Sequence, residues 1–329
     1  MKNFFSSLPS LPDREIWGHK GTYGTAALVC GSLGMSGAAV LSGSAALESG
    51  AGLVRLLVPE PIHDTVASSR SEYTVSPLPA DRRGRFLRDG LPEIESHLST
   101  CSAFGIGPGI GRSLGLDVMI ARLFSFLPVP AVFDADALNS LAYREMFRLP
   151  SERKVFRDVP IVPPAGPRIL TPHPGEFFRM CGHRVGPDPE ERRKAVLRFF
   201  QNLEKIYKSD RPAIFLVLKG SGTVISDGRR IFVNETGNPG MGTGGAGDVL
   251  TGVITALAAQ GIPPFDAAVL GVAIHGLAGD LAAEVKGETS LTAGDILEFL
   301  PQAFKQCKRP KVLTHRTNRD IPGVSHFCS

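Results

Sequence analysis

Short apolar runs alternate with longer helical segments through most of the chain. Three intervening segments, 38–49, 116–126 and 190–205, have helical patterns. Strands that alternate with helices form a mainly parallel sheet covered on both faces, because each parallel connection must cross over the sheet. We therefore expect an α/β fold with a helix, sheet and helix layer. Six apolar runs have the length and composition of buried strands: 26–29, 53–58, 103–106, 131–133, 169–170 and 214–218.

A hairpin is predicted after the sixth apolar run. Two further short runs, 223–226 and 230–233, flank the pair Asp227-Gly228. An Asp-Gly pair in this position favours a tight turn between two antiparallel strands. From Gly245 onward the pattern is almost entirely helical.

The chain shows no internal repeat with a period of about 20–50 residues and no linker long enough to divide it. We therefore expect a single domain over residues 1–304, followed by a basic tail over residues 305–329. Within the domain, the segment 152–166 is rich in charge and proline. This composition predicts an excursion on the surface.

The composition excludes some classes of protein. The 329 residues are 43% hydrophobic and 21% charged, which is typical of an ordinary enzyme-like chain with a sizeable core. The formal net charge of +4 is small, and its excess gathers in the basic tail. Aromatic residues make up 7% of the chain and form no stripe with basic residues, so we expect no binding to nucleic acid.

Apolar runs and cysteines indicate the compartment. Glycine, serine or charged residues interrupt the longest apolar runs before they reach membrane-spanning length, and no leader-like segment opens the chain. The cysteines are odd in number and lack a paired CxxC spacing, which predicts neither a disulfide framework nor a zinc site. We therefore expect a cytoplasmic protein without a membrane partner. The cysteines are Cys30, Cys101, Cys181, Cys307 and Cys328.

The segment 234–250 is rich in glycine and brings Asp248 to the start of an apolar helical pattern. Glycines let a backbone pass close to bulky anions, and a helix N-terminus offers unpaired N–H groups and the positive end of the helix dipole. This arrangement predicts a phosphate-binding loop. Asp248 in the first helical turn suits a general base beside a phosphoryl group. The alternative is a glycine-rich surface loop that caps a core helix.

Two further glycine turns follow predicted strands, at 31–38 and 105–111. In open α/β sheets, ligands bind at the carboxyl ends of the strands. The first turn has the pattern GxxGxxG, which is not the dinucleotide fingerprint, and it is not a P-loop, because no Lys-Ser or Lys-Thr follows its last glycine. Each turn either passes close to a ligand or is a tight turn.

Polar residues follow three other predicted strands. Asp134 and Asp136 could bind a metal or water, although we expect Asp136 to cap the next helix. The proline-framed turn 171–176 fixes His173 and Glu176, either as ligand-binding groups or as structural hydrogen-bonding residues. The segment 219–223 supplies a lysine, two glycines and two hydroxyls, which suit a nucleotide phosphate or ribose. A tight hairpin with a charged strand end is the alternative.

Together, these segments resemble the ADP- or ATP-dependent NAD(P)H-hydrate dehydratases, a branch of the ribokinase-like fold. The resemblance spans roughly residues 14 to 300, and the motifs in this order are far more specific than any one motif. It implies a ribokinase-like three-layer α/β/α fold with a central, mainly parallel sheet. The matching segments are 19–24, 31–41, 45–54, 107–109, 134–139, 171–176, 219–223 and 237–250.

The resemblance implies a carbon–oxygen lyase that repairs damaged nicotinamide cofactors. In such enzymes the hydrated ring of (6S)-NADHX or (6S)-NADPHX loses water at the expense of a nucleotide phosphoanhydride, which returns NADH or NADPH. We expect ADP to be converted to AMP and phosphate, with ATP as the alternative donor. Mg²⁺ is expected on the nucleotide phosphates. The sequence decides neither the donor nor the preference between NADHX and NADPHX.

Site residues follow from the resemblance. Asp248 is implied as the catalytic base, and Glu176 occupies the place where related kinases carry an acid that orders the metal through water. The hydrate is implied to contact Ala38, Gly109, His173 and Asp248. The nucleotide is implied to bind Lys219, Gly220, Ser221, Gly222, Thr223 and Gly247.

Two other functions use similar motifs. A ribokinase-like kinase of a hydroxymethyl vitamin precursor shares the glycine turn and its aspartate, but such kinases usually have Asn in the place of His173. A catalytically silent nucleotide-binding regulator is the other, and Asp248 argues against it. The residues before His19 leave no room for the epimerase domain that many family members carry, so we expect a separate epimerase to supply the other epimer. We also expect a homo-oligomer.

Overall fold

The computed structural model describes residues 2–156, 161–208 and 213–308. The part of the predicted basic tail beyond Lys308, with Cys328, lies outside the described residues. Described strands form one sheet in the order β3-β2-β1-β4-β5-β6-β7-β8-β9. All neighbouring pairs from β3 to β7 along this order are parallel. Strand β8 is antiparallel to β7, and β9 is antiparallel to β8. The strands are β1 (Thr25–Val29), β2 (Leu53–Pro59), β3 (Thr74–Leu78), β4 (Ala103–Ile106), β5 (Ala131–Phe133), β6 (Arg168–Leu170), β7 (Ile214–Leu218), β8 (Val224–Ser226) and β9 (Ile231–Val233).

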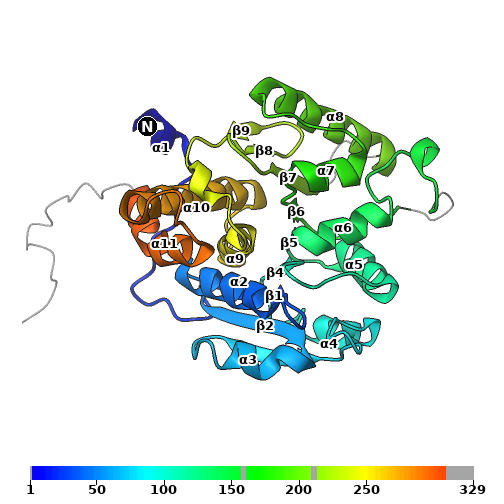
Figure 1. Cartoon of the computed structure of the whole chain (residues 1–329), viewed down its shortest axis with the longest axis horizontal. Coiled ribbons are helices and arrows are strands. Elements are labelled where there is room, and N and C mark those ends of the chain that lie inside the picture. Colours follow the sequence, from blue (N-terminus) through cyan, green and yellow to red (C-terminus); the bar gives the residue numbers. More distant parts are fainter. Residues whose placement is uncertain (1, 157–160, 209–212, 309–329) are drawn as a thin grey trace, which may run out of the picture.

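Helices cover both faces of the sheet (Figure 1). One face carries α2 (Ser36–Glu48), α9 (Ala246–Ala259), α10 (Pro264–Lys286) and α11 (Ala293–Cys307). The other face carries α4 (Leu91–Ser96), α5 (Leu114–Phe126), α6 (Ala135–Tyr143), α7 (Pro174–Cys181) and α8 (Pro189–Tyr207). The short α3 (His63–Ala67) contacts β3, and α1 (Lys2–Ser7) lies against β9 through Phe4 and Phe232.

Strand side chains alternate between two cores, as the pleat of a sheet requires. In β1, Ala26 and Leu28 enter the core under α2, α9 and α10, whereas Ala27 and Val29 enter the core under α4 to α8. All five β1 residues are buried, as expected for a central strand of a parallel sheet. The predicted three-layer α/β/α fold with a mainly parallel sheet is therefore confirmed.

Most predicted elements appear with shifts of one or two residues at their ends. The hairpin of β8 and β9 turns at Asp227, whose Oδ1 accepts the N–H groups of Arg229 at 3.0 Å and Arg230 at 2.7 Å.

Strand β3 was not predicted. It lies at the sheet edge, most of its residues are not buried, and Pro77 interrupts its apolar pattern, so sequence periodicity gives little signal for it.

The predicted helix cap at Asp136 is wrong. Helix α6 begins at Ala135, so Asp134 occupies the N-cap position and Asp136 lies in the first turn. The carboxylate of Asp136 instead accepts the Gly111 N–H at 2.9 Å. Its partner is a turn on a neighbouring strand, which is remote in sequence.

The segment 152–166 is only in part the surface excursion that was expected. Val155 and Val162 are exposed, but Arg153 is buried. The Glu145 carboxylate accepts three successive backbone N–H groups, those of Lys154, Val155 and Phe156, at 2.9 to 3.1 Å. This carboxylate ties the start of the excursion to the end of α6, and residues 157–160 lie outside the described part of the chain.

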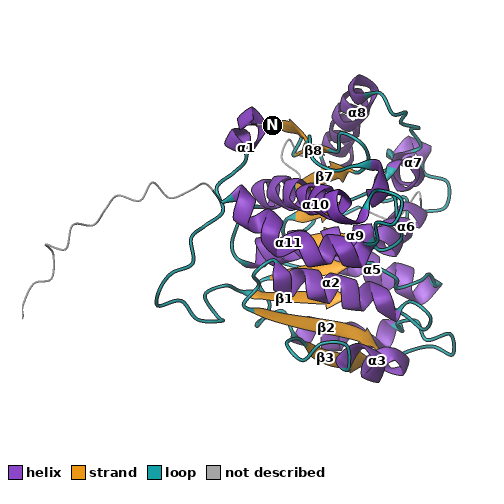
Figure 2. Cartoon of the chain, turned by 60° about the vertical axis from the view of Figure 1, so that its left-hand side comes forward, coloured by secondary structure: helices purple, strands orange, loops and turns teal. Residues whose placement is uncertain are grey.

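Helix α10 is long and apolar enough, by length and composition, to cross a membrane. In this fold, 78% of its most apolar window is buried, and it packs against α9 and α11 on one face of the sheet (Figure 2). An apolar helix of this kind is a core helix of the α/β fold.

The strand order reverses between β1 and β4, whose carboxyl ends lie side by side. The turns that follow these two strands are joined by hydrogen bonds from Gly31 N to Pro108 O and from Ser32 Oγ to Gly109 O, both at 2.7 Å. In open α/β sheets the crevice at this reversal is a common ligand site. Both glycine turns noted in the sequence therefore lie at the place where the fold favours a ligand.

The close approach of α2 and α9 is predicted to depend on Gly252. A Cβ at Gly252 would overlap the backbone carbonyl of Ser42, whereas one at Gly37, in the first turn of α2, would meet no atom within 4 Å. Gly252→Ala should lower the free energy of unfolding by about 1–3 kcal/mol. Gly37→Ala is the matched control and should leave it unchanged or raise it by up to about 1 kcal/mol. Urea unfolding of both variants tests this, and equal stabilities would contradict the close packing.

Candidate active site

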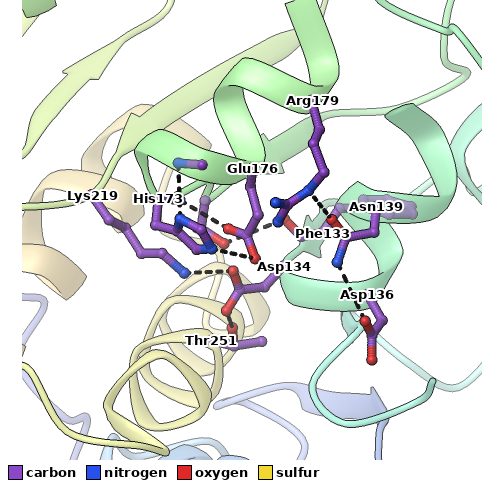
Figure 3. A network of polar contacts seen from close by, with 11 residues as sticks. Phe133, Asp134, Asp136, Asn139, His173, Glu176, Arg179, Lys219 and Thr251 are labelled. Atoms are coloured by element: carbon purple, nitrogen blue, oxygen red, sulfur yellow. Dashed lines mark hydrogen bonds and ion pairs between the residues drawn. The ribbon is translucent and has the colours of Figure 1, made fainter. Parts of the chain in front are cut away.

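The candidate site lies at the carboxyl edge of the sheet, where three neighbouring strands each deliver a polar residue. Asp134 follows β5, His173 follows β6 and Lys219 follows β7. Parallel strands end at the same edge, so residues far apart in sequence meet there (Figure 3). The glycine-rich segment and α9 close the site from the side of the other helix layer.

A buried ion pair connects the strands to α9. Lys219 Nζ lies 2.7 Å from Asp134 Oδ1, and Asp134 Oδ2 accepts the Thr251 hydroxyl at 2.9 Å. Burial alone would lower the pKa of Lys219, but the carboxylates of Asp134 and Glu176 outweigh it and raise this pKa. Lys219 is therefore held as an ammonium, with its other donors available to an anion.

The glycine-rich segment is fixed from α10. The Asp280 carboxylate accepts the Gly237 N–H at 2.8 Å and the side-chain amide of Asn238 at 3.0 Å. The ring of His275 lies 2.9 Å from the carbonyl of Ala246, through Nε2. These contacts hold both ends of the loop before any ligand binds.

Helix α9 begins at Ala246, directly after Gly245, whose φ of 90° belongs to the left-handed region. Asp248 lies in the first turn, as the sequence predicted. A Cβ built at Gly247 would come within 3.4 Å of Lys219 Nζ and 3.5 Å of Asp134 Oδ2. The start of α9, with its unpaired N–H groups, therefore lies beside the Lys219 ammonium, and together they form an anion-binding corner.

Asp248 has the protonation behaviour of a general base for neutral pH. Burial, together with the charges of Asp134 and Asp136, raises the pKa of Asp248 to about 7, against the opposing effect of Lys219. The Asp248 backbone is fixed to α2, since the Ser42 hydroxyl donates to its carbonyl at 3.0 Å. A carboxylate with a pKa near the working pH accepts a proton efficiently while a substantial fraction stays ionised.

Sequence reasoning missed Arg192, which shapes the turn after β7. Arg192 lies on α8, is 2% exposed, and donates hydrogen bonds to the carbonyls of Lys219, Ser221 and Gly222. A Cβ at Gly220 would overlap its guanidinium, and the φ of Gly220 is 139°. Its position in the strongly charged pattern of α8 gives no sequence signal that separates it from solvated neighbours.

His173 has a structural role in addition to its place at the site. It caps α7: its Nδ1 accepts the Gly175 N–H at 3.0 Å, while Glu176 accepts the His173 backbone N–H at 2.9 Å. Burial, then Lys219 and Arg179, lower the pKa of His173. Burial raises the pKa of Glu176, against the effect of Lys219. Both residues thus act as structural hydrogen-bonding residues, which was one of the two predicted roles. His173 also lines the cavity.

A cavity of about 840 Å³ opens between the turn after β7 and the glycine-rich segment. Its volume falls within the range of small-molecule sites. His173 lines this cavity, and so does every residue that was predicted to bind the nucleotide. These residues are Lys219, Gly220, Ser221, Gly222, Thr223 and Gly247.

Ala38 and Gly109 meet outside this cavity. A Cβ built at Gly109 would lie 2.8 Å from the Ala38 Cβ, so the turns after β1 and β4 touch there. Ala38 lies on α2 one helical turn before Ser42, whose hydroxyl binds the backbone of Asp248. Asp248 is not among the residues that line the cavity. It interacts electrostatically with Lys219, which does line it, and its backbone is bonded through Ser42 to the helix that carries Ala38.

The described residues include no cluster of three or more His, Cys, Asp or Glu side chains that could hold a metal ion. The four described cysteines are free. A divalent cation at this site would therefore need ligands from a bound phosphate or from water in addition to the protein.

The family follows from the sequence match. The sequence model described as NAD(P)H-hydrate dehydratase matches residues 26–302, most of the chain. The chain belongs to the NAD(P)H-hydrate dehydratase family. This confirms the predicted resemblance, and the match includes every residue assigned to the site.

Relatives of two kinds are similar to this family member. The bifunctional NAD(P)H-hydrate repair enzyme Nnr of Moorella thermoacetica is 39% identical over 297 residues, which cover 90% of this chain and 52% of that relative. The chain thus spans about half the length of the bifunctional relatives it matches. The ADP-dependent (S)-NAD(P)H-hydrate dehydratase of Bacillus subtilis is 31% identical over 301 residues, which cover 90% of this chain and 95% of that relative.

Solved structures share the fold. The ADP/ATP-dependent NAD(P)H-hydrate dehydratase from Bacillus subtilis, co-crystallized with ATP/Mg²⁺, superimposes with a TM-score of 0.70 at 29% identity, covering 93% of this chain and 97% of that one. A ribokinase-like superfamily protein from Enterococcus faecalis reaches a TM-score of 0.70 at 20% identity, covering 94% and 96% of the two chains. The ribokinase-like fold is therefore confirmed.

Arg192 is predicted to hold the turn after β7 in shape. Arg192→Met removes the donors to three carbonyls and should speed amide hydrogen exchange across residues 219–223 by about tenfold or more. Arg193→Met, at an exposed neighbouring position, is the control and should leave this exchange unchanged. Exchange measured by mass spectrometry decides, and unchanged protection in Arg192→Met would show that the turn keeps its shape without the guanidinium.

Proposed function

We propose that this chain dehydrates (6S)-NADHX and (6S)-NADPHX to NADH and NADPH, while ADP is converted to AMP and phosphate. The observation that carries the proposal is the position of Asp248, a carboxylate with a pKa of about 7 at the start of α9, beside the Lys219 ammonium. Family membership and the similarity to the ADP-dependent dehydratase of Bacillus subtilis support this activity. The similarity supports ADP as donor, with ATP as the alternative.

The nucleotide is proposed to occupy the 840 Å³ cavity. Backbone groups of residues 220–223 and the Thr223 hydroxyl would contact it, with the transferred phosphate between Lys219 and the N–H groups at Gly247. An ammonium and a helix N-terminus that both face a phosphate stabilise the charge that develops on it during transfer. The hydrate would approach Asp248 past Ala38 and Gly109, with His173 at the border of the two sites.

The chemistry needs a proton acceptor and a better leaving group than hydroxide. Asp248 takes the proton of the ring hydroxyl as its oxygen attacks the terminal phosphorus of ADP, so that a P–O bond forms and the phosphoanhydride bond breaks with release of AMP. The C–O bond of the ring then breaks, and phosphate leaves with its electron pair while the ring nitrogen supplies electrons. The proton on the adjacent ring carbon then passes to the departing phosphate or to water, which restores the dihydropyridine. Lys219 would stabilise the negative charge on the phosphate oxygens during its transfer and its departure.

Magnesium fits as a companion of the nucleotide. The described residues provide no protein cluster for a metal, so the phosphates would supply most of its ligands. Glu176, which is buried and lies close enough to Lys219 to raise its pKa, is the residue that would contact the ion through water. Bound Mg²⁺ would neutralise charge on the phosphates, and it was present when the Bacillus subtilis enzyme was crystallised.

The wider setting is part of the same proposal. The bifunctional relatives are named as NAD(P)H-hydrate repair enzymes, and supply of the other epimer by a separate epimerase stays a prediction. A cytoplasmic location and a homo-oligomeric assembly remain predictions. For the vitamin-precursor kinase, a hydroxyethylthiazole kinase from Pyrococcus horikoshii shares the fold alone, with a TM-score of 0.52 at 15% identity. The family match favours the dehydratase.

A coupled assay tests the function. Purified protein, Mg²⁺ and hydrated NADH are incubated with ADP or with ATP, and the return of dihydronicotinamide absorbance is followed together with phosphate release. Recovery that requires one nucleotide supports the reaction and identifies its donor. No recovery from folded, nucleotide-binding protein would favour the kinase, which is then tested with hydroxymethyl vitamin precursors.

Asp248→Asn is predicted to remove most turnover. An amide cannot take the hydroxyl proton, so kcat should fall by about 10²–10⁴-fold while ADP still binds. The free energy of unfolding of this variant should exceed that of the parent by more at pH 8 than at pH 4. The folded pKa of Asp248 is raised, so its ionisation lowers stability as pH rises toward about 7. Near-normal kcat would contradict the assignment.

The pH dependence of the reaction is the second prediction for Asp248. Because its carboxylate must be ionised to act, kcat/KM should rise with pH up to about 7 and fall about tenfold per unit below it. An ordinary exposed aspartate would place this limb near pH 4. A steady-state profile from pH 5 to 9 checks this, and a limb near 4 would contradict the effect of burial and Asp134.

A further inference from the structure

A second charged surface lies on the sheet half that carries Ala38 and Gly109. The loop of residues 81–85 follows β3 and contains Arg82, Arg83 and Arg85. Arg85 is neutralised by Asp81, whose Oδ2 accepts hydrogen bonds from Arg85 Nε at 2.9 Å and Nη2 at 2.6 Å. Arg82 and Arg83 are exposed, and neither has an ion pair among the described residues. Two unpaired guanidinium groups thus remain on one short loop.

The loop has a fixed shape without a ligand. Asp81 Oδ1 accepts the backbone N–H groups of Arg83 at 2.9 Å and Arg85 at 3.0 Å. The Gly84 N–H donates to the Asp81 carbonyl at 2.8 Å, and the φ of Gly84 is 66°, which favours glycine. The two free arginines are therefore carried on a preformed turn, so less ordering cost opposes binding there.

This loop lies against both glycine turns of the site. Leu33 N donates to the Gly84 carbonyl at 3.1 Å, and a Cβ at Gly84 would overlap the Leu33 side chain. On the other side, Arg85 donates to the carbonyl of Arg112, and a Cβ at Gly111 would lie 3.1 Å from Arg85 Cδ. Residues 81–85 thus connect the turn that leads to Ala38 with the turn that contains Gly109.

The same contacts lead back to the reacting centre. The Gly111 N–H donates to Asp136, and the charge of Asp136 contributes to the raised pKa of Asp248. Leu33 and Met35, on the turn beside the loop, are large apolar residues that are 60% and 54% exposed. An exposed apolar pair next to unpaired arginines matches a ligand with both flat rings and phosphates.

The hydrated dinucleotide is such a ligand. If its ring reaches Asp248 and the cavity holds ADP, the pyrophosphate and adenosine must extend along the glycine turns, away from the cavity. We propose that Arg82 and Arg83 form the subsite for the phosphates of the hydrated dinucleotide, with Leu33 and Met35 beside its rings. Guanidinium groups bind phosphate oxygens through two parallel hydrogen bonds. This inference rests on the proposed function.

The test compares the double variant Arg82→Gln/Arg83→Gln with Arg198→Gln, an exposed arginine of α8 on the other half of the sheet. Steady-state kinetics at saturating ADP give KM and kcat for NADHX and NADPHX, and fluorescence titration gives Kd for the products NADH and NADPH. The double variant should raise KM and Kd about tenfold and leave kcat and the KM for ADP unchanged. Arg198→Gln should change none of them.

The two substrates separate the two possible phosphates. An effect on NADPHX and NADPH alone supports recognition of the 2′-phosphate, and an equal effect on both pairs supports recognition of the pyrophosphate. Unchanged KM and Kd, an equal effect from Arg198→Gln, or a raised KM for ADP would each overturn the subsite. Should the parent protein show no turnover, the product titrations still decide the subsite, so failure of the reaction and failure of the subsite are distinguishable.

Discussion

The ion pair between Lys219 and Asp134 is the contact on which the site depends. Asp134 comes from the end of β5 and Lys219 from the end of β7, and Thr251 ties the same carboxylate to α9. Removal of one partner of a buried pair leaves an uncompensated charge, which is strongly destabilising. The pair therefore fixes the spacing of two strand ends and the first turns of α9 while it keeps a positive charge at the edge of the cavity.

Asp248 owes its properties to the same arrangement. The carboxylate of Asp134 keeps Lys219 charged and also raises the pKa of Asp248, whereas Lys219 lowers it. The near-neutral pKa is thus a balance between burial, a like charge and an opposite charge, all set by residues from different strands. A change at Asp134 would alter both the anion-binding corner and the base.

The sequence could predict features that depend on a short, continuous segment of the chain. The apolar runs located most strands, Asp227-Gly228 located the hairpin, and the glycine-rich segment placed Asp248 in the first turn of α9. Features that depend on remote contacts were not predictable from patterns. The carboxylate of Asp136 binds the Gly111 turn instead of capping α6, and Arg192 resembles its solvated neighbours until α8 is packed against the turn after β7. Edge strand β3 lacks the buried pattern that periodicity detects.

The cap on α7 has a consequence for the chemistry of His173. Its Nδ1 accepts the Gly175 N–H, so in the neutral ring the proton must reside on Nε2. Protonation of Nδ1 would set two N–H groups against each other and undo the cap, in keeping with the lowered pKa. The helix thereby selects one tautomer of the imidazole. The Nε2–H then faces the Glu176 carboxylate, whose Oε1 lies 3.4 Å away, so the cap of α7 also orients the imidazole toward this acid.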